Sequence, residues 1–172
     1  MKEKMIIGIS IVVIAALLRL VPHIPNVTPL AAMAFFGGAY LDRKWALILP
    51  LTALFISDLI LGFHSTMPFV YGCFILSGCI GYLLRSHRTV PFLALGSLVS
   101  STLFFIITNF GVWLTGTMYE KTLSGLMQSY VMGVPFFRNT LLGDGLYLTL
   151  FVSLFAVATV FVGRKAQRSA SI

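Results

Sequence analysis

The chain has 172 residues, of which 58% are hydrophobic and only 10% charged, and its mean hydropathy is +0.97. This composition lies far outside the range of soluble domains, so it excludes a soluble enzyme or a soluble binding module. The formal net charge of +7 would suggest nucleic acid as the partner of a soluble protein. In a membrane protein it reflects basic residues on the cytoplasmic side, and we expect no nucleic-acid partner.

Six apolar segments along the chain predict membrane helices, because about 20 residues of helix span the hydrocarbon core of a bilayer. The first segment follows Lys2 and Lys4, as a signal peptide would, but no small-residue cleavage site precedes the prolines that follow it. We therefore expect a retained helix. The predicted helices are Met5–Val21, Pro29–Leu41, Trp45–Gly62, Met67–Leu84, Pro91–Leu114 and Asn139–Val162.

The segment between the first two helices contains Pro22, Pro25 and Pro29, which prevent a regular helix there. Irregular backbone at membrane depth is tolerated only where it is buried in protein or lines a wet cavity. This segment therefore predicts one wall of a small-molecule site. The second helix is too short to span a bilayer alone, and its small residues Ala34 and Gly38 place it at the centre of the helix bundle.

An amphipathic segment, Thr122–Val134, lies between the last two predicted membrane helices. It predicts an interfacial helix in the outer loop rather than a spanning one. Residues 1–163 form one predicted transmembrane domain, and residues 164–172 a basic, disordered cytoplasmic tail. The apolar residues on one face of the interfacial helix are Leu123, Leu126, Met127, Tyr130 and Val134.

Lysine and arginine are distributed unequally between the two sides of this predicted topology. Six helices place both termini on one side. That side holds Lys2, Lys4, Arg43, Lys44, Arg85, Arg88, Arg164, Lys165 and Arg168, and the other side holds Arg19, Lys121 and Arg138. This excess predicts that both termini are cytoplasmic. The fold class is therefore an all-α membrane protein with six transmembrane helices.

The uncommon polar side chains gather in the outer half of this topology. Ionisable and polar groups at membrane depth are functional candidates because their desolvation is costly. The candidate ligand-binding residues are His23, Asn26, Thr28, Asp58, His64, Asn109, Trp113, Tyr119, Arg138, Asn139 and Asp144. No metal-ligand spacing or cofactor motif is present, so we expect neither a metal nor a cofactor.

A purely structural interpretation of the two outer aspartates stands beside the functional one. Asp58 would then pair with His23 or Arg19, and Asp144 with Arg138. The sequence does not decide between ion pairs that stabilise the fold and carboxylates that bind a ligand.

The run PHIPNVTPLAAMAFFGGAYLDRKWALILPLTALFISDLILGFH resembles a family of uncharacterised bacterial six-helix membrane proteins, as do TNFGVWLTGTMY and PFFRNTLLGD. That family is in turn similar to the substrate-binding S-components of energy-coupling factor (ECF) vitamin transporters, in size, helix number, cytoplasmic termini and outer polar residues. The resemblance implies a multi-pass protein of the bacterial inner membrane.

The same resemblance implies how such a protein works. An S-component captures a vitamin or its precursor from outside, under the loops after its first, third and fifth helices. It then topples in the membrane when an ECF module, made of a coupling subunit and two ATPases, drives release inward. An alanine motif on the first helix often marks the contact with that module, and here only Ala15 and Ala16 are present. Cobalamin is the first substrate expected, with Cys73, His23 and Asp58 in loosely similar places.

Two other functions remain open from the sequence. One is a membrane-embedded enzyme at the outer face, with Asp58, His64 or Asp144 as acid and base. The other is a structural accessory subunit of a larger membrane complex, in keeping with the many small residues that allow close packing. We expect the first function, a binding subunit without enzyme activity of its own.

Overall fold

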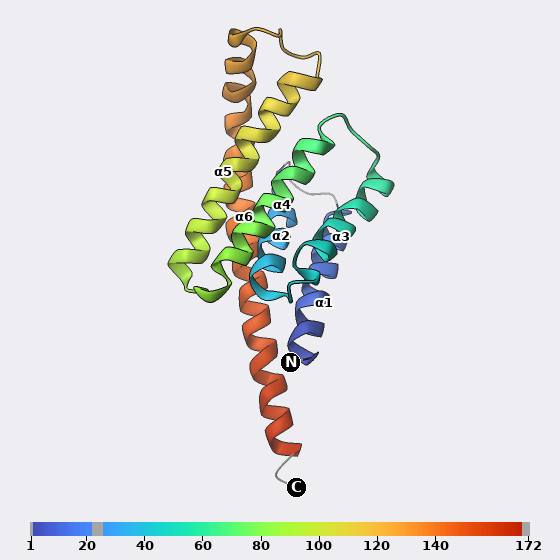
Figure 1. Cartoon of the computed structure of the whole chain (residues 1–172), viewed down its shortest axis with the longest axis vertical. Helices are drawn as coiled ribbons and strands as arrows, with labels where there is room; N and C mark the ends of the chain where they lie inside the picture. Colours follow the sequence, from blue (N-terminus) through green and yellow to red (C-terminus); the bar gives the residue numbers. More distant parts are fainter. Residues whose placement is uncertain (1, 22–25, 170–172) are drawn as a thin grey trace.

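The computed structural model describes residues 2–21 and 26–169, and the regular structure in this part of the chain is helical (Figure 1). The elements are α1 (Lys2–Leu18), α2 (Leu30–Tyr40), α3 (Trp45–Leu61), α4 (Met67–Leu83), the 3-10 turn η1 (Leu84–Ser86), α5 (Val90–Thr115) and α6 (Leu123–Ser169). The ends of α1 to α5 lie within three residues of the predicted ends, so these five segments are confirmed as helices.

The prediction of a separate interfacial helix is wrong. The predicted segment from Leu123 onward and the last predicted membrane helix belong to one helix, α6, which is 47 residues long and contains Pro135. A proline inside a helix loses one backbone hydrogen bond, but its fixed φ is compatible with helical geometry. The neighbouring turns of α6 continue the helix past it. The same helix extends through Ser169, where the sequence had predicted a disordered tail.

Among the described residues, three helical stretches are long and apolar enough to cross a membrane, as expected of a membrane protein. They are Met67–Ser86, Val90–Thr115 and Leu123–Arg164, and α2 and α3 are shorter apolar helices. The last stretch has 42 residues and is therefore about 60 Å long, twice the thickness of the hydrocarbon core. As a result, α5 and the first part of α6 form a hairpin that extends beyond the other helices (Figure 1, top).

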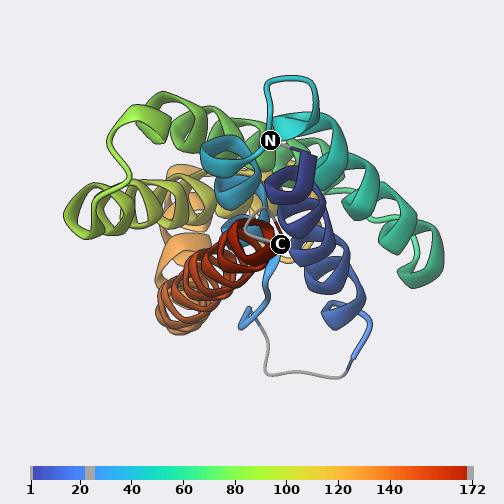
Figure 2. The same cartoon turned by 90° about the horizontal axis from the view of Figure 1, so that it is seen from below.

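Helix α2 lies at the centre of the bundle, as its small residues predicted. Every residue from Leu30 to Ala39 is buried, and α2 packs against each of the other five α-helices (Figure 2). Phe35 and Phe36 are almost completely inaccessible, and the Phe36 ring contacts Phe151 of α6 with 6.0 Å between ring centroids. A helix that protein surrounds on all sides needs no polar face, and the apolar sequence of α2 provides none.

Glycines bring the backbones of α2 and α4 into direct contact. A Cβ atom built on Gly38 of α2 would overlap the carbonyl oxygen of Gly78, and one built on Gly81 of α4 would overlap the carbonyl oxygen of Phe35. Backbone oxygens cannot move aside as the tip of a flexible side chain can. Glycine is therefore required at both positions for the helices to approach this closely.

We predict that Gly38→Ala destabilises the protein by about 1–3 kcal/mol, because the added methyl group overpacks the contact with Gly78. The matched control is Gly72→Ala on α4, where an added Cβ meets no atom within 4 Å. That change should be neutral or slightly stabilising, since alanine favours helix over glycine. Melting curves of both variants in detergent check this; equal melting temperatures would show that the α2–α4 contact is not tight.

Candidate functional site

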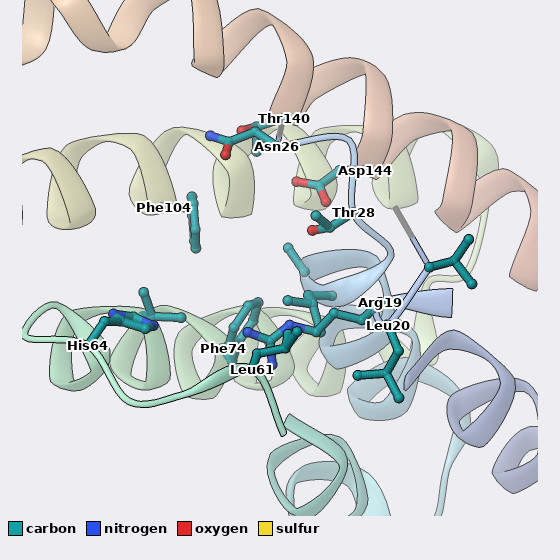
Figure 3. Close-up of a pocket in the computed structure, with 14 residues that line it drawn as sticks. Arg19, Leu20, Asn26, Thr28, Leu61, His64, Phe74, Phe104, Thr140 and Asp144 are labelled. Atoms are coloured by element: carbon teal, nitrogen blue, oxygen red, sulfur yellow. The ribbon is translucent and has the colours of Figure 1, made fainter. Parts of the chain in front are cut away.

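A cavity of about 530 Å³ lies beside the first turn of α2, and every α-helix or the loop at its end contributes to its wall (Figure 3). Most of the lining is apolar, and six lining residues are polar. The apolar lining residues are Leu20, Val21, Leu30, Ala31, Leu61, Val70, Phe74 and Phe104. The polar lining residues are Arg19, Asn26, Thr28, His64, Thr140 and Asp144.

The polar residues occupy two sides of the cavity. Asn26, Thr140 and Asp144 lie along one side, and Arg19 and His64 along the other (Figure 3). The described part of the proline-rich segment therefore lines a cavity, as its irregular backbone predicted.

The segment 26–28 is held against α6 by backbone geometry. Asn26 has a φ of 62°, in the left-handed region that asparagine tolerates better than most residues. Gly143 of α6 faces this segment, and a Cβ atom built on it would lie 3.0 Å from the Cα atom of Val27 and 3.3 Å from the nitrogen of Thr28. The absence of a side chain at Gly143 thus lets the segment lie directly on α6, with Asn26 and Thr28 at the cavity.

Asp144 of α6 binds the N-terminus of α2. The first backbone N–H groups of a helix lack partners within it, and Pro29 at the N-cap position of α2 provides no side-chain acceptor. The backbone N–H of Ala32 donates a hydrogen bond to the Asp144 carboxylate instead. The Ser101 hydroxyl of α5 lies 2.6 Å from Oδ2 of Asp144, within the range of a charge-assisted hydrogen bond. Asp144 is 4% exposed and joins α2, α5 and α6 at the cavity wall.

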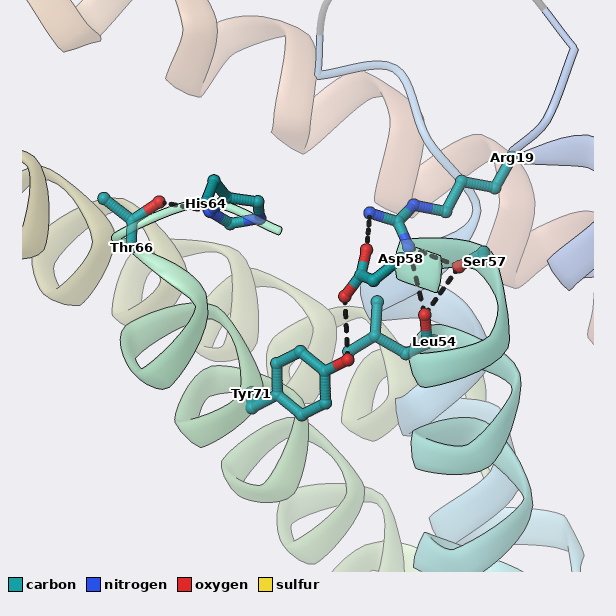
Figure 4. A network of polar contacts seen from close by, with 7 residues as sticks. All are labelled: Arg19, Leu54, Ser57, Asp58, His64, Thr66 and Tyr71. Atoms are coloured by element: carbon teal, nitrogen blue, oxygen red, sulfur yellow. Dashed lines mark hydrogen bonds and ion pairs between the residues drawn. The ribbon is translucent and has the colours of Figure 1, made fainter. Parts of the chain in front are cut away.

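Arg19, just after α1, forms a buried ion pair with Asp58 of α3 (Figure 4). Its Nη2 atom lies 2.6 Å from Oδ1 of Asp58, and its Nη1 atom donates to the hydroxyl of Ser57 and to the carbonyl oxygen of Leu54. The Tyr71 hydroxyl of α4 donates to Oδ2 of Asp58 at 2.7 Å. Asp58 is only 1% exposed, so this network connects α1, α3 and α4 in the interior of the bundle.

The structure separates the two aspartates that the sequence could not distinguish. Asp58 pairs with Arg19, one of the two partners considered for it, and it does not line the cavity. Asp144 lines the cavity, and its partners in the described part of the chain are neutral donors rather than Arg138, whose side chain is exposed.

Four of the predicted ligand-binding residues come together at the cavity: Asn26, Thr28, His64 and Asp144. The ring Nδ1 of His64 lies 2.8 Å from the Thr66 hydroxyl oxygen and has that neutral partner rather than a carboxylate. Among the described residues, no three histidine, cysteine or acidic side chains are placed to share a metal ion.

Other predicted residues lie outside the cavity lining. The Asn109 amide donates to the carbonyl oxygen of Phe105 at 2.8 Å, within α5, and the Trp113 indole donates to the carbonyl oxygen of Glu120 at 2.9 Å. The predicted residues that do not line the cavity are Asp58, Asn109, Trp113, Tyr119, Arg138 and Asn139. His23 lies outside the described residues.

Sequence reasoning missed several residues of the site. Thr140 lines the cavity one helical turn before Asp144, and this spacing of four residues could have identified it. Nothing in the sequence indicated that Phe74 and Phe104 line a site, because phenylalanine is common throughout the chain. The contact of Tyr71 with Asp58 was also missed, because Tyr71 lies within an apolar helix. Arg19 had been considered only as a partner of Asp58.

A model of the family of unknown function DUF6580 matches residues 1–168 of the chain, and the chain belongs to that family. No curated protein and no solved structure matches the chain.

The ion pair between Arg19 and Asp58 should be measurable as a coupling energy. We predict that Asp58→Asn or Arg19→Gln alone destabilises the protein by about 3–5 kcal/mol, because each leaves a buried charge without its partner. The double variant should cost less than the sum of the two by roughly 0.5–3 kcal/mol. Asp42→Asn, at an exposed carboxylate, is the control and should be neutral. Additive losses in denaturation experiments would show that the two side chains do not interact.

Proposed function

We propose that this DUF6580 protein is a substrate-binding membrane subunit, similar to an ECF S-component, that serves the uptake of a small vitamin-like molecule. The observation that carries the proposal is the cavity of about 530 Å³ beside α2. Small-molecule sites typically measure about 300–1,000 Å³ and combine an apolar lining with a few placed polar groups. The lining here has that composition.

The size of the cavity favours a small ligand. Its volume lies in the lower half of the range of pockets that hold drug-sized molecules. A corrinoid such as cobalamin is far larger than such molecules. Cys73, the cobalt ligand considered from the sequence, is buried and does not line the cavity. We therefore propose a vitamin or vitamin precursor smaller than cobalamin.

The position of the cavity fits capture from the outside. The ends of α1 and α3 and the beginnings of α2 and α4 surround it, at the end of these helices opposite to the N-terminus. The excess of lysine and arginine on the side of the N-terminus supports a cytoplasmic N-terminus. In the proposed topology the chain crosses the bacterial inner membrane six times, both termini are cytoplasmic and the cavity lies in the outer half.

Release inward would use an ECF module as partner. The alanine pair on α1 is poorly placed for that contact, because Ala15 is completely buried and Ala16 is partly buried. A coupling subunit would instead contact the exposed apolar face of α1, which carries Ile6, Val13, Ile14 and Leu17. Bilayer lipids cover the same face when the subunit is alone.

The alternative functions have less support. An enzyme using His64 as a base would need a carboxylate to orient the ring, and the described partner of His64 is Thr66. An accessory subunit would present its small residues to other proteins, whereas Gly38 and Gly81 are used between α2 and α4 of the same chain.

A bulky residue in the cavity should abolish ligand retention. We predict that the detergent-purified protein carries a small-molecule adduct in native mass spectrometry and that Val70→Trp, at the cavity wall, loses it. Leu76→Trp is the matched control, because this residue of the same helix is 41% exposed and faces away from the core. Wild-type protein without an adduct, or an adduct retained by Val70→Trp, would overturn the proposed site.

The topology can be tested independently of any ligand. We predict that a fluorescent protein fused after Ile172 fluoresces in bacterial cells, because the fusion stays in the cytoplasm, and that alkaline phosphatase fused at the same point is inactive. The opposite pair of results would place the C-terminus outside and the cavity on the cytoplasmic side.

A further inference from the structure

The charges at the cavity do not balance within the described part of the chain. The titratable side chains in its lining are Arg19, His64 and Asp144. Arg19 already shares an ion pair with Asp58 directly behind it, so these two groups together contribute no net charge. Asp144 is the only acidic residue among the lining residues.

The guanidinium of Arg19 is largely occupied by its own partners. Its Nη1 group donates to Ser57 and to the carbonyl oxygen of Leu54, and its Nη2 atom forms the ion pair with Asp58. An anionic ligand would have to compete with the 2.6 Å contact to Asp58, whose own burial makes the loss of this partner costly. Arg19 is therefore a poor anchor for an anion.

Asp144 retains unused acceptor capacity. A carboxylate offers about four lone-pair positions, and the Ser101 hydroxyl and the Ala32 N–H occupy two of them. Both donors are neutral, and among the side chains that the structure describes no ion pair joins Asp144 to a cation. A carboxylate that is 4% exposed at membrane depth carries a large desolvation cost, which a bound cation offsets best.

The remaining wall suits the body of an organic cation. Phe74 and Phe104 line the cavity together, with 6.0 Å between their ring centroids. Aromatic faces attract cations and also bury apolar groups. Asn26 and Thr140 lie on the same side as Asp144 and add neutral hydrogen-bonding groups (Figure 3).

We infer that the ligand of this cavity is a small organic cation with at least one N–H donor, such as a protonated amine or amidine, and that Asp144 is its counter-ion. This inference rests on the proposed function, because it names the chemical class of the substrate for the same site. The cation binds Asp144 through a charge-assisted hydrogen bond, and its apolar body lies against Phe74 and Phe104.

Three probes of one shape test this inference: benzylammonium, benzyl alcohol and benzoate. Each is titrated to millimolar concentration against the detergent-purified full chain, with thermal stabilisation as the readout. Benzylammonium alone should stabilise the wild type. Asp144→Asn should weaken its apparent Kd by roughly 10- to 100-fold, the usual effect of losing a hydrogen bond to a charged group. Asparagine keeps a carbonyl acceptor for the Ala32 N–H, and its NH2 group can donate to the Ser101 hydroxyl, so the fold should be retained.

One control separates charge from structure. Asp42→Asn makes the same chemical change at an exposed carboxylate and should have no effect. Equal stabilisation by benzyl alcohol or benzoate, or undiminished benzylammonium binding by Asp144→Asn, would overturn the inference.

Native mass spectrometry of the wild type distinguishes failure of the inference from failure of the proposed function. A resident adduct identified as an amine or other N–H cation supports both. A neutral or anionic adduct, with no response to benzylammonium, supports a binding subunit but overturns the ligand class. No adduct and no response to any probe would overturn both.

Discussion

The close contact between α2 and α4 is the constraint on which the rest of the structure depends. Helix–helix association in a bilayer relies on packing, because lipid is as apolar as the helices themselves. Gly38 and Gly81 let the two backbones meet directly, and this contact fixes the position of α2 along the bundle. The other helices then pack around α2, which leaves almost none of its surface exposed.

The cavity follows from the shortness of this central helix. Eleven residues of α2 extend only about 16 Å, roughly half of a hydrocarbon core. Its first turn therefore lies inside the protein, with unpaired backbone N–H groups and space beyond them. Asp144 accepts from one of those groups, and Leu30 and Ala31 of the same turn line the cavity. A helix of full length would leave neither the space nor the need for a buried acceptor.

The helices could be predicted from sequence more fully than the site. Apolar length and proline positions located α1 to α5, and small residues located α2 at the centre. The break expected between Val134 and Asn139 was wrong: the amphipathic pattern suggested a separate interfacial helix, while the structure continues one helix through Pro135. Asn26 and Thr28 of the proline-rich segment line the cavity together with Asp144, and their role in ligand binding stays a prediction. Which polar residues share it depends on helix rotation and on tertiary distance, and a single sequence contains neither.

Asp58 and Asp144 show why tertiary partners decide the role of a buried carboxylate. Both lie within apolar helices and are almost inaccessible. Asp58 meets a guanidinium and a phenol hydroxyl, so its charge is compensated within the chain and a ligand has nothing to add. Asp144 meets two neutral donors, which hold the carboxylate in place without cancelling its charge. Stability should therefore depend on the charge of Asp58, and ligand choice on the charge of Asp144. One bundle thus holds a carboxylate paired with a guanidinium and, across the cavity from that guanidinium, a carboxylate whose described partners are neutral.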